Sequence, residues 1–165
     1  MKKTLFAIAA VLFGMALTVS CGKMDEPIPN QYLVSKMGGY INLDQKNKFS
    51  VGSIIGAWEI DSIYEETYVN GNRTERRQQN NDLHPSTYRF NRGYTMGGDG
   101  KWTYAHNFLV WEDSGGLHAY EVVRAGLGTL VLRWESFPQG GGSHVPYVID
   151  KGGEHRFVVY KFHRK

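Results

Sequence analysis

The 165-residue chain has one cysteine, Cys21, so it cannot form an internal disulfide. Its longest apolar run, residues 5–17, is too short to span a bilayer comfortably. The formal net charge is only +3, and Lys2 and Lys3 at the start of the chain contribute two of the positive charges. The charge balance therefore gives no reason to expect a nucleic-acid partner.

A targeting leader explains the first twenty residues. Two lysines precede the apolar run, and Thr18, Val19 and Ser20 supply small residues for cleavage. Cys21 is the next residue, and two ways of processing the leader fit this position. An ordinary peptidase would cut after Ser20 and leave a free thiol, whereas lipidation would make Cys21 an anchor in the membrane.

Aromatic residues make up 13% of the chain, enough to build a core without disulfides. Residues 54–69 alternate between apolar and polar side chains, which predicts a first strand. Asn70-Gly71 follows as a two-residue hairpin signal. About seven more strands are expected, at residues 73–79, 86–91, 101–111, 117–125, 129–137, 144–149 and 154–163.

Short turns between all these segments favour an antiparallel meander, and closure would remove its exposed edges. We therefore expect an all-β protein with an eight-stranded up-and-down β-barrel. The leader takes residues 1–20, the lipid anchor and a flexible tether take 21–50, and the barrel takes 51–165. No convincing helical period is found after Leu43.

Three local patterns carry a family resemblance. The position of Cys21 resembles the lipobox of bacterial lipoproteins, although Thr18 stands where leucine is usual, and Gly22–Glu26 resembles the lysine-and-acid export signal of Bacteroidetes lipoproteins. Gly56-Ala57-Trp58 resembles the Gly-x-Trp signature of lipocalins. The resemblance implies a lipocalin-like domain in a lipoprotein at the outer membrane, exposed at the cell surface. It also implies that Trp58 closes one end of the barrel under Arg164 or Arg156, which would pack as a cation across its ring.

The barrel interior is the expected place for a ligand. Four aromatic residues of the strands and two polar residues of the first strand would line it: Trp102, Tyr104, Trp134, Tyr88, Ser62 and Glu66. A small apolar or glycan-derived molecule would suit such a lining. The alternative is a filled core, because bulky rings take up the space that a ligand needs.

Residues for catalysis or metal binding are not apparent. The six histidines are scattered along the chain and lack zinc-site spacing, and the serines lie mainly in turns. We therefore expect no enzyme activity, cofactor or metal. The favoured function is a lipid-anchored binding protein. The alternative is a protein-interaction or inhibitor module of the outer membrane, which would use an exposed Trp111 beside the turn at residues 113–116 and the glycine-rich loop at 140–142.

Overall fold

The computed structural model describes residues 28–38, 41–80, 87–136 and 153–165. Within these residues a helix, α1 (Gln31–Lys36), and a 3-10 turn, η1 (Val51–Ser53), precede nine strands. The strands are β1 (Gly56–Val69), β2 (Asn72–Gln79), β3 (Thr87–Phe90), β4 (Thr95–Met96), β5 (Gly100–Ala105), β6 (Phe108–Asp113), β7 (Gly116–Gly126), β8 (Thr129–Glu135) and β9 (Glu154–Arg164). The predicted strand at 144–149 and the loop at 138–142 lie outside the described residues.

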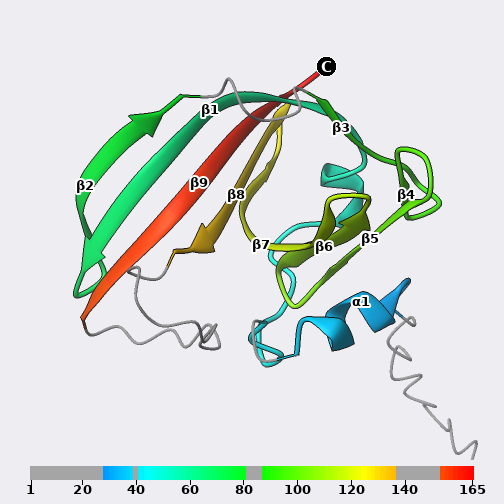
Figure 1. The fold of residues 1–165 in the computed structure, drawn as a ribbon, viewed down its shortest axis with the longest axis horizontal. Helices are drawn as coiled ribbons and strands as arrows, with labels where there is room; N and C mark the ends of the chain where they lie inside the picture. Colours follow the sequence, from blue (N-terminus) through cyan, green and yellow to red (C-terminus); the bar gives the residue numbers. More distant parts are fainter. Residues whose placement is uncertain (1–27, 39–40, 81–86, 137–152) are drawn as a thin grey trace, which may run out of the picture.

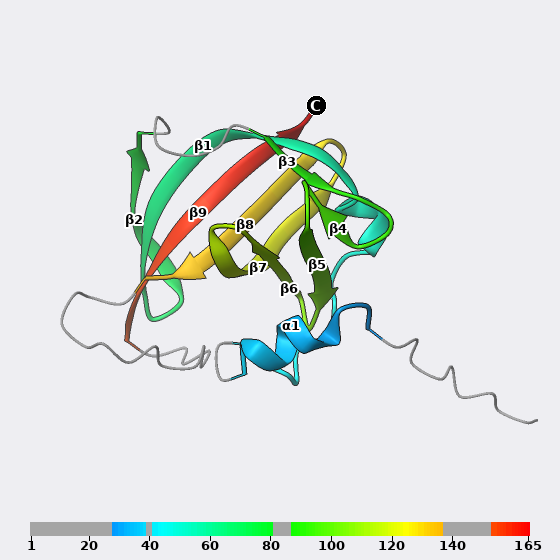
Figure 2. The same cartoon turned by 45° about the vertical axis from the view of Figure 1, so that its right-hand side comes forward.

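The strands close into a barrel, as the meander predicted. Their order is β2-β1-β3-β4-β5-β6-β7-β8-β9, all pairings between the described strands are antiparallel, and β9 pairs back onto β1. Eight strands, β1 and β3 to β9, therefore form the closed barrel, and β2 is an additional strand at its edge (Figures 1 and 2). The all-β class and the eight-stranded barrel are confirmed.

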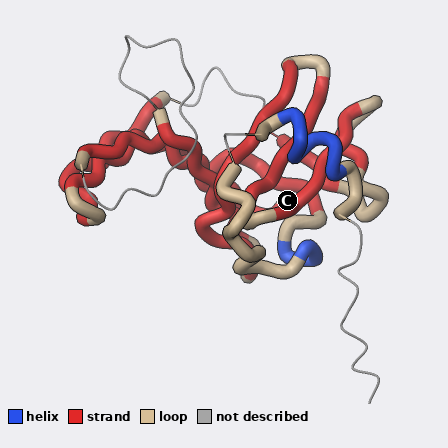
Figure 3. The backbone as a smooth tube through the Cα atoms, turned by 90° about the horizontal axis from the view of Figure 1, so that it is seen from below, coloured by secondary structure: helices blue, strands red, loops and turns tan. Residues whose placement is uncertain are grey.

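β1 is too long to stay within the barrel, and its two halves have different neighbours. Residues Gly56–Glu59 pair with β3, whereas Ile63–Val69 pair with β2 on the same edge. β9 follows the other edge along almost the whole strand. The far parts of β1 and β9 together with β2 project from the barrel (Figure 3), and we call these strands the sheet extension.

A tight turn divides the segment that the sequence suggested was one strand over residues 101–111. His106 and Asn107 have φ values of 53° and 63°, and they join β5 to β6 as a two-residue hairpin. Asn tolerates this left-handed conformation better than most residues, so glycine is not needed there. The prediction of a single strand over residues 101–111 was therefore wrong. Trp102 and Tyr104 on β5 and Leu109 and Trp111 on β6 share the barrel interior, whereas Phe108 and Val110 pack outside it.

Much of the segment expected to be a tether packs on the barrel. Leu33 and Val34 of α1 are buried against Ala105, Phe108 and Val110, on the outer face of β5 and β6. Farther along, the Lys48 amide donates to the Asn107 side chain, and the Asn107 amide donates to Asn47 Oδ1. The expectation of a flexible tether over 21–50 therefore does not hold for residues 28–38 and 41–50.

Candidate functional site

One end of the barrel is built around Gly56, Trp58 and Arg164. Trp58 is fully buried, its Nε1 donates to the Ile54 carbonyl at 2.6 Å, and the Arg164 guanidinium lies 4.6 Å from its ring centre. Arg164 also donates to the carbonyls of Ile55 and Ser53. Gly56 has φ 147°, and a Cβ there would lie 2.9 Å from Arg164 Nη1, so glycine meets both a backbone and a space requirement. The structure thus brings together the three residues that the lipocalin resemblance indicated, with Arg164 rather than Arg156 over the ring.

Trp102 and Tyr104 are core residues with their polar atoms already paired. Trp102 Nε1 donates to the Asn91 carbonyl, and Tyr104 Oη donates to Asn107 Oδ1 at 2.9 Å. Asn107 is fully buried and also donates to the Val122 carbonyl. These residues fill this part of the barrel, as the filled-core alternative held, and they are not among the residues lining the pocket described below.

A β-bulge moves Ser62 and Glu66 away from the interior. Ile60 pairs with Phe162 but Ser62 pairs with Lys161, so Asp61 is an extra residue and the faces exchange after it. Glu66 is buried on the outer face of the sheet extension. There it accepts hydrogen bonds from Tyr68 at 3.0 Å and from Arg73 at 3.0 Å. The inward position expected for Ser62 and Glu66 is therefore wrong, and their burial reflects packing and ion pairing outside the barrel.

Trp134 and Trp111 also differ from expectation. Trp134 points to the inner side of β8, but it lies where the sheet leaves the barrel and remains 40% exposed, and it is not among the pocket-lining residues. Trp111 was expected on the surface, yet it is only 4% exposed and packs inside the barrel. A docking site based on an exposed Trp111 is therefore excluded. The loop at 140–142 lies outside the described residues.

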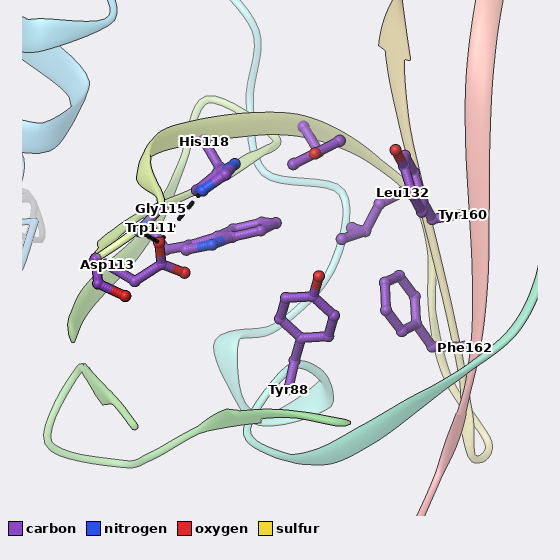
Figure 4. Close-up of a pocket in the computed structure, with 10 residues that line it drawn as sticks. Tyr88, Trp111, Asp113, Gly115, His118, Leu132, Tyr160 and Phe162 are labelled. Carbon is purple, nitrogen blue, oxygen red and sulfur yellow. Dashed lines mark hydrogen bonds and ion pairs between the residues drawn. The ribbon is translucent and has the colours of Figure 1, made fainter. Parts of the chain in front are cut away.

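The structure places a pocket of about 420 Å³ between β3, the β6–β7 hairpin, β8 and β9. Its described lining consists mainly of aromatic side chains, with a polar group at one end: Tyr88, Trp111, Asp113, Ser114, Gly115, His118, Tyr120, Leu132, Tyr160 and Phe162. Figure 4 shows Leu132, Tyr160 and Phe162 on one side of the hollow, and Asp113 and His118 on the other. Of the four aromatic residues predicted to contact a ligand, this pocket contains Tyr88.

The polar end is organised by the β6–β7 turn. Asp113 Oδ1 accepts a hydrogen bond from the Gly115 amide at 2.8 Å and lies 3.4 Å from His118 Nε2. His118 and Tyr120 stack on Trp111 with ring-centre distances of 5.0 and 4.9 Å, while Tyr88 stands on the other side of the indole (Figure 4). Cross-strand pairing of Trp111 with His118 produces this arrangement.

Three tyrosines carry hydroxyl groups into the aromatic part of the pocket. The rings of Tyr120 and Tyr160 meet edge to face with their centres 5.5 Å apart. Burial raises the pKa of Tyr88, Tyr120 and Tyr160, most strongly that of Tyr120. These phenols therefore stay neutral at physiological pH and serve as hydrogen-bonding groups on an apolar wall.

The pocket does not present an activated nucleophile. Ser114 lines it beside the Asp113–His118 pair, but among the described residues no hydrogen bond joins the serine hydroxyl to His118. The described part of the chain also holds no group of three or more His, Cys, Asp or Glu side chains placed for a metal. That the protein has no enzyme activity stays a prediction.

The sequence alone did not single out most of the pocket. Tyr120, Tyr160 and Phe162 face inward by strand alternation, but nothing in the pattern separates them from core residues. Asp113, Ser114 and Gly115 were interpreted as a turn, which is correct, and the register of β6 and β7 brings that turn to the pocket. A search for polar side chains in turns that border aromatic strands would have found them.

Cys21 lies outside the described residues, so the anchor prediction is not tested. Within the described part of the chain, no helix has the length and apolar character needed to cross a membrane. Comparison with family models, with curated proteins and with solved structures gave no match to this chain.

Proposed function

We propose that the protein is a lipid-anchored, lipocalin-like binding protein that holds a small, mainly apolar molecule in the pocket between β3, the β6–β7 hairpin, β8 and β9. The observation that carries the proposal is the pocket itself. About 420 Å³ lies within the range of small-molecule sites, and the lining combines several aromatic rings with a few polar groups. A barrel needed only as a scaffold would gain stability by filling such a hollow.

The chemistry of the lining favours an apolar body over a sugar. Tyr120 and His118 cover one side of Trp111, so that side of the indole is not available as a platform for a sugar ring. Leu132, Phe162 and Tyr88 supply apolar surface around the rest of the hollow. Of the two ligand classes expected from the sequence, the structure therefore supports the small apolar molecule better than the glycan-derived one.

A neutral fluorescent probe tests the binding function. N-phenyl-1-naphthylamine gains fluorescence in apolar sites, and we expect saturable binding with one site per protein. Tyr88→Ala removes a wall of the pocket and should weaken binding at least about tenfold, which corresponds to about 1.4 kcal/mol. Tyr32→Ala is the matched control, because Tyr32 lies on α1 and does not line this pocket.

Two results would contradict the proposal. One is the absence of saturable probe binding together with the absence of any small molecule in mass spectra of protein extracted from its native source. The other is an equal loss of binding in Tyr32→Ala and Tyr88→Ala.

The membrane anchor is a separate part of the proposal. The cysteine directly after the leader carries it, since acyl chains on Cys21 would hold the barrel at the outer membrane. Membrane fractionation of wild type and Cys21→Ser should find the wild type with the membranes and the variant released. If mass spectrometry finds an unmodified thiol on the mature wild-type protein, the anchor is refuted and the binding function is unaffected.

A further inference from the structure

The pocket is asymmetric in both shape and charge. Its apolar end is formed by Leu132, Phe162 and the ring of Tyr160, and its polar end by Asp113, Ser114 and His118 (Figure 4). Among the described lining residues, Asp113 is the one with a formal charge at pH 7 when histidine is neutral, and there is no lysine or arginine. The field inside the hollow is therefore negative at one end.

The neighbours of Asp113 leave this charge largely uncompensated. Its Oδ1 accepts from the Gly115 amide, which fixes the carboxylate in the turn, and its contact with His118 is 3.4 Å long. Where a described lysine or arginine side chain forms an ion pair, its partner is a carboxylate other than Asp113. The nearest in sequence is the pair of Lys36 with Glu112, which does not line the pocket.

Aromatic rings line the hollow between this carboxylate and the apolar end. Tyr88 lies across the indole of Trp111 at 5.9 Å between ring centres, and Tyr88 meets Phe162 edge to face at 5.8 Å. Ring faces carry partial negative charge and attract cations, most strongly where water is excluded. Carboxylate and rings thus favour the same ligand charge.

We propose that the ligand is an amphipathic organic cation, with a protonated amine or quaternary ammonium group next to Asp113 and an apolar body toward Leu132 and Phe162. The proposal rests on the proposed binding function and names the ligand class. An anion at the same place would meet Asp113 with no lysine or arginine from the described lining to offset the repulsion. A fatty acid or a phosphorylated sugar is therefore disfavoured.

Calorimetric titration of the intact protein with two matched probes tests the charge preference. 2-Phenylethylammonium and 2-phenylethanol have nearly the same size and ring but differ in charge. We expect the ammonium ion to bind about tenfold more tightly, which is the magnitude of a cation near desolvated rings and one carboxylate.

Asp113→Asn locates the preference. The asparagine keeps an acceptor for the Gly115 amide, so the turn is preserved. The substitution should abolish the difference in affinity between the two probes while the affinity for the alcohol stays unchanged. Glu112→Gln is the control, because it removes the same charge one residue away on the other face of β6 and should keep the preference.

The outcomes separate the two proposals. If the alcohol binds as tightly as the ammonium ion, or if Asp113→Asn retains the preference, the cation proposal is wrong and a neutral-ligand pocket stands. If neither probe nor the naphthylamine dye binds, the binding function itself fails.

Discussion

Replacing Trp58 and Trp111 separately by phenylalanine should have opposite effects on the hydrogen bonds of the core. Both indoles are almost completely buried, so the loss of ring area is similar. Trp58 Nε1 donates to the Ile54 carbonyl at 2.6 Å, whereas Trp111 Nε1 is buried without a partner among the described residues. Trp58→Phe therefore leaves a buried carbonyl unpaired, and Trp111→Phe removes a donor that is already unpaired.

The size of the difference follows from the cost of unpaired polar groups. Leaving a buried carbonyl without a donor costs about 1–3 kcal/mol, and removing an unpaired N–H returns a similar amount. We therefore expect Trp58→Phe to be less stable than Trp111→Phe by about 2–6 kcal/mol. Trp102→Phe should lie between them, because the Asn91 carbonyl that loses the indole still accepts from the Tyr94 amide.

Urea unfolding followed by circular dichroism gives the three free energies of unfolding, and the slopes of the transitions check that the unfolded states are comparable. The predicted order of stability is Trp111→Phe, then Trp102→Phe, then Trp58→Phe. If Trp111→Phe is as destabilising as Trp58→Phe, lost packing outweighs hydrogen bonding and this account of the core is refuted.

Three further predictions concern the barrel end, the β5–β6 turn and alkaline pH. Gly56→Ala should lower stability by about 1–3 kcal/mol through backbone strain and the clash of its Cβ with the Arg164 guanidinium, and thermal melts of the variant and wild type check this. Asn107→Gly keeps the left-handed turn but loses the side-chain hydrogen bonds with Tyr104, Lys48 and Val122. It should lower the free energy of unfolding by about 2–4 kcal/mol and speed proteolysis at residues 41–50. Equal protease resistance in the variant and the wild type would contradict this prediction. The raised pKa of Tyr120 means that this phenol ionises first in the unfolded chain. Its contribution to the free energy of unfolding is therefore complete below about pH 10 and is lost above it, at about 1.4 kcal/mol per pH unit. Titration at 295 nm should show the Tyr120 phenolate appearing only as the protein unfolds, and its ionisation in the folded protein with an ordinary pKa would refute the burial argument.

The sequence predicted those elements that a few neighbouring residues determine. Alternation in residues 54–69 and the Asn70-Gly71 turn correspond to β1 and the hairpin to β2, where Asn70 has φ 51° and Gly71 φ 80°. Gly56 and Trp58 were found because they belong to a short motif with a steric reason. In each case a few neighbouring residues determine the outcome.

What the sequence did not reveal depends on register and on partners far along the chain. The bulge at Asp61 adds one residue to an otherwise regular alternation, and only its pairing with β9 shows that Ser62 and Glu66 have changed faces. The turn at His106 and Asn107 contains no glycine or proline, so the hairpin resembles one long strand. α1 has only six residues, too few for a helical period, and tertiary packing of Leu33 and Val34 supports it.

The length of β1 links the barrel to its pocket. Pairing with β3 ends at Glu59 and pairing with β2 begins at Ile63, so on this edge residues 60–62 have no partner strand among the described residues. On the other edge of β1, Ile60 pairs with Phe162 of β9 and Ile63 pairs with Tyr160 of β9. Both of these β9 side chains line the pocket. The transfer of β1 from one neighbour to the next therefore takes place opposite two of the aromatic side chains that line the candidate binding site.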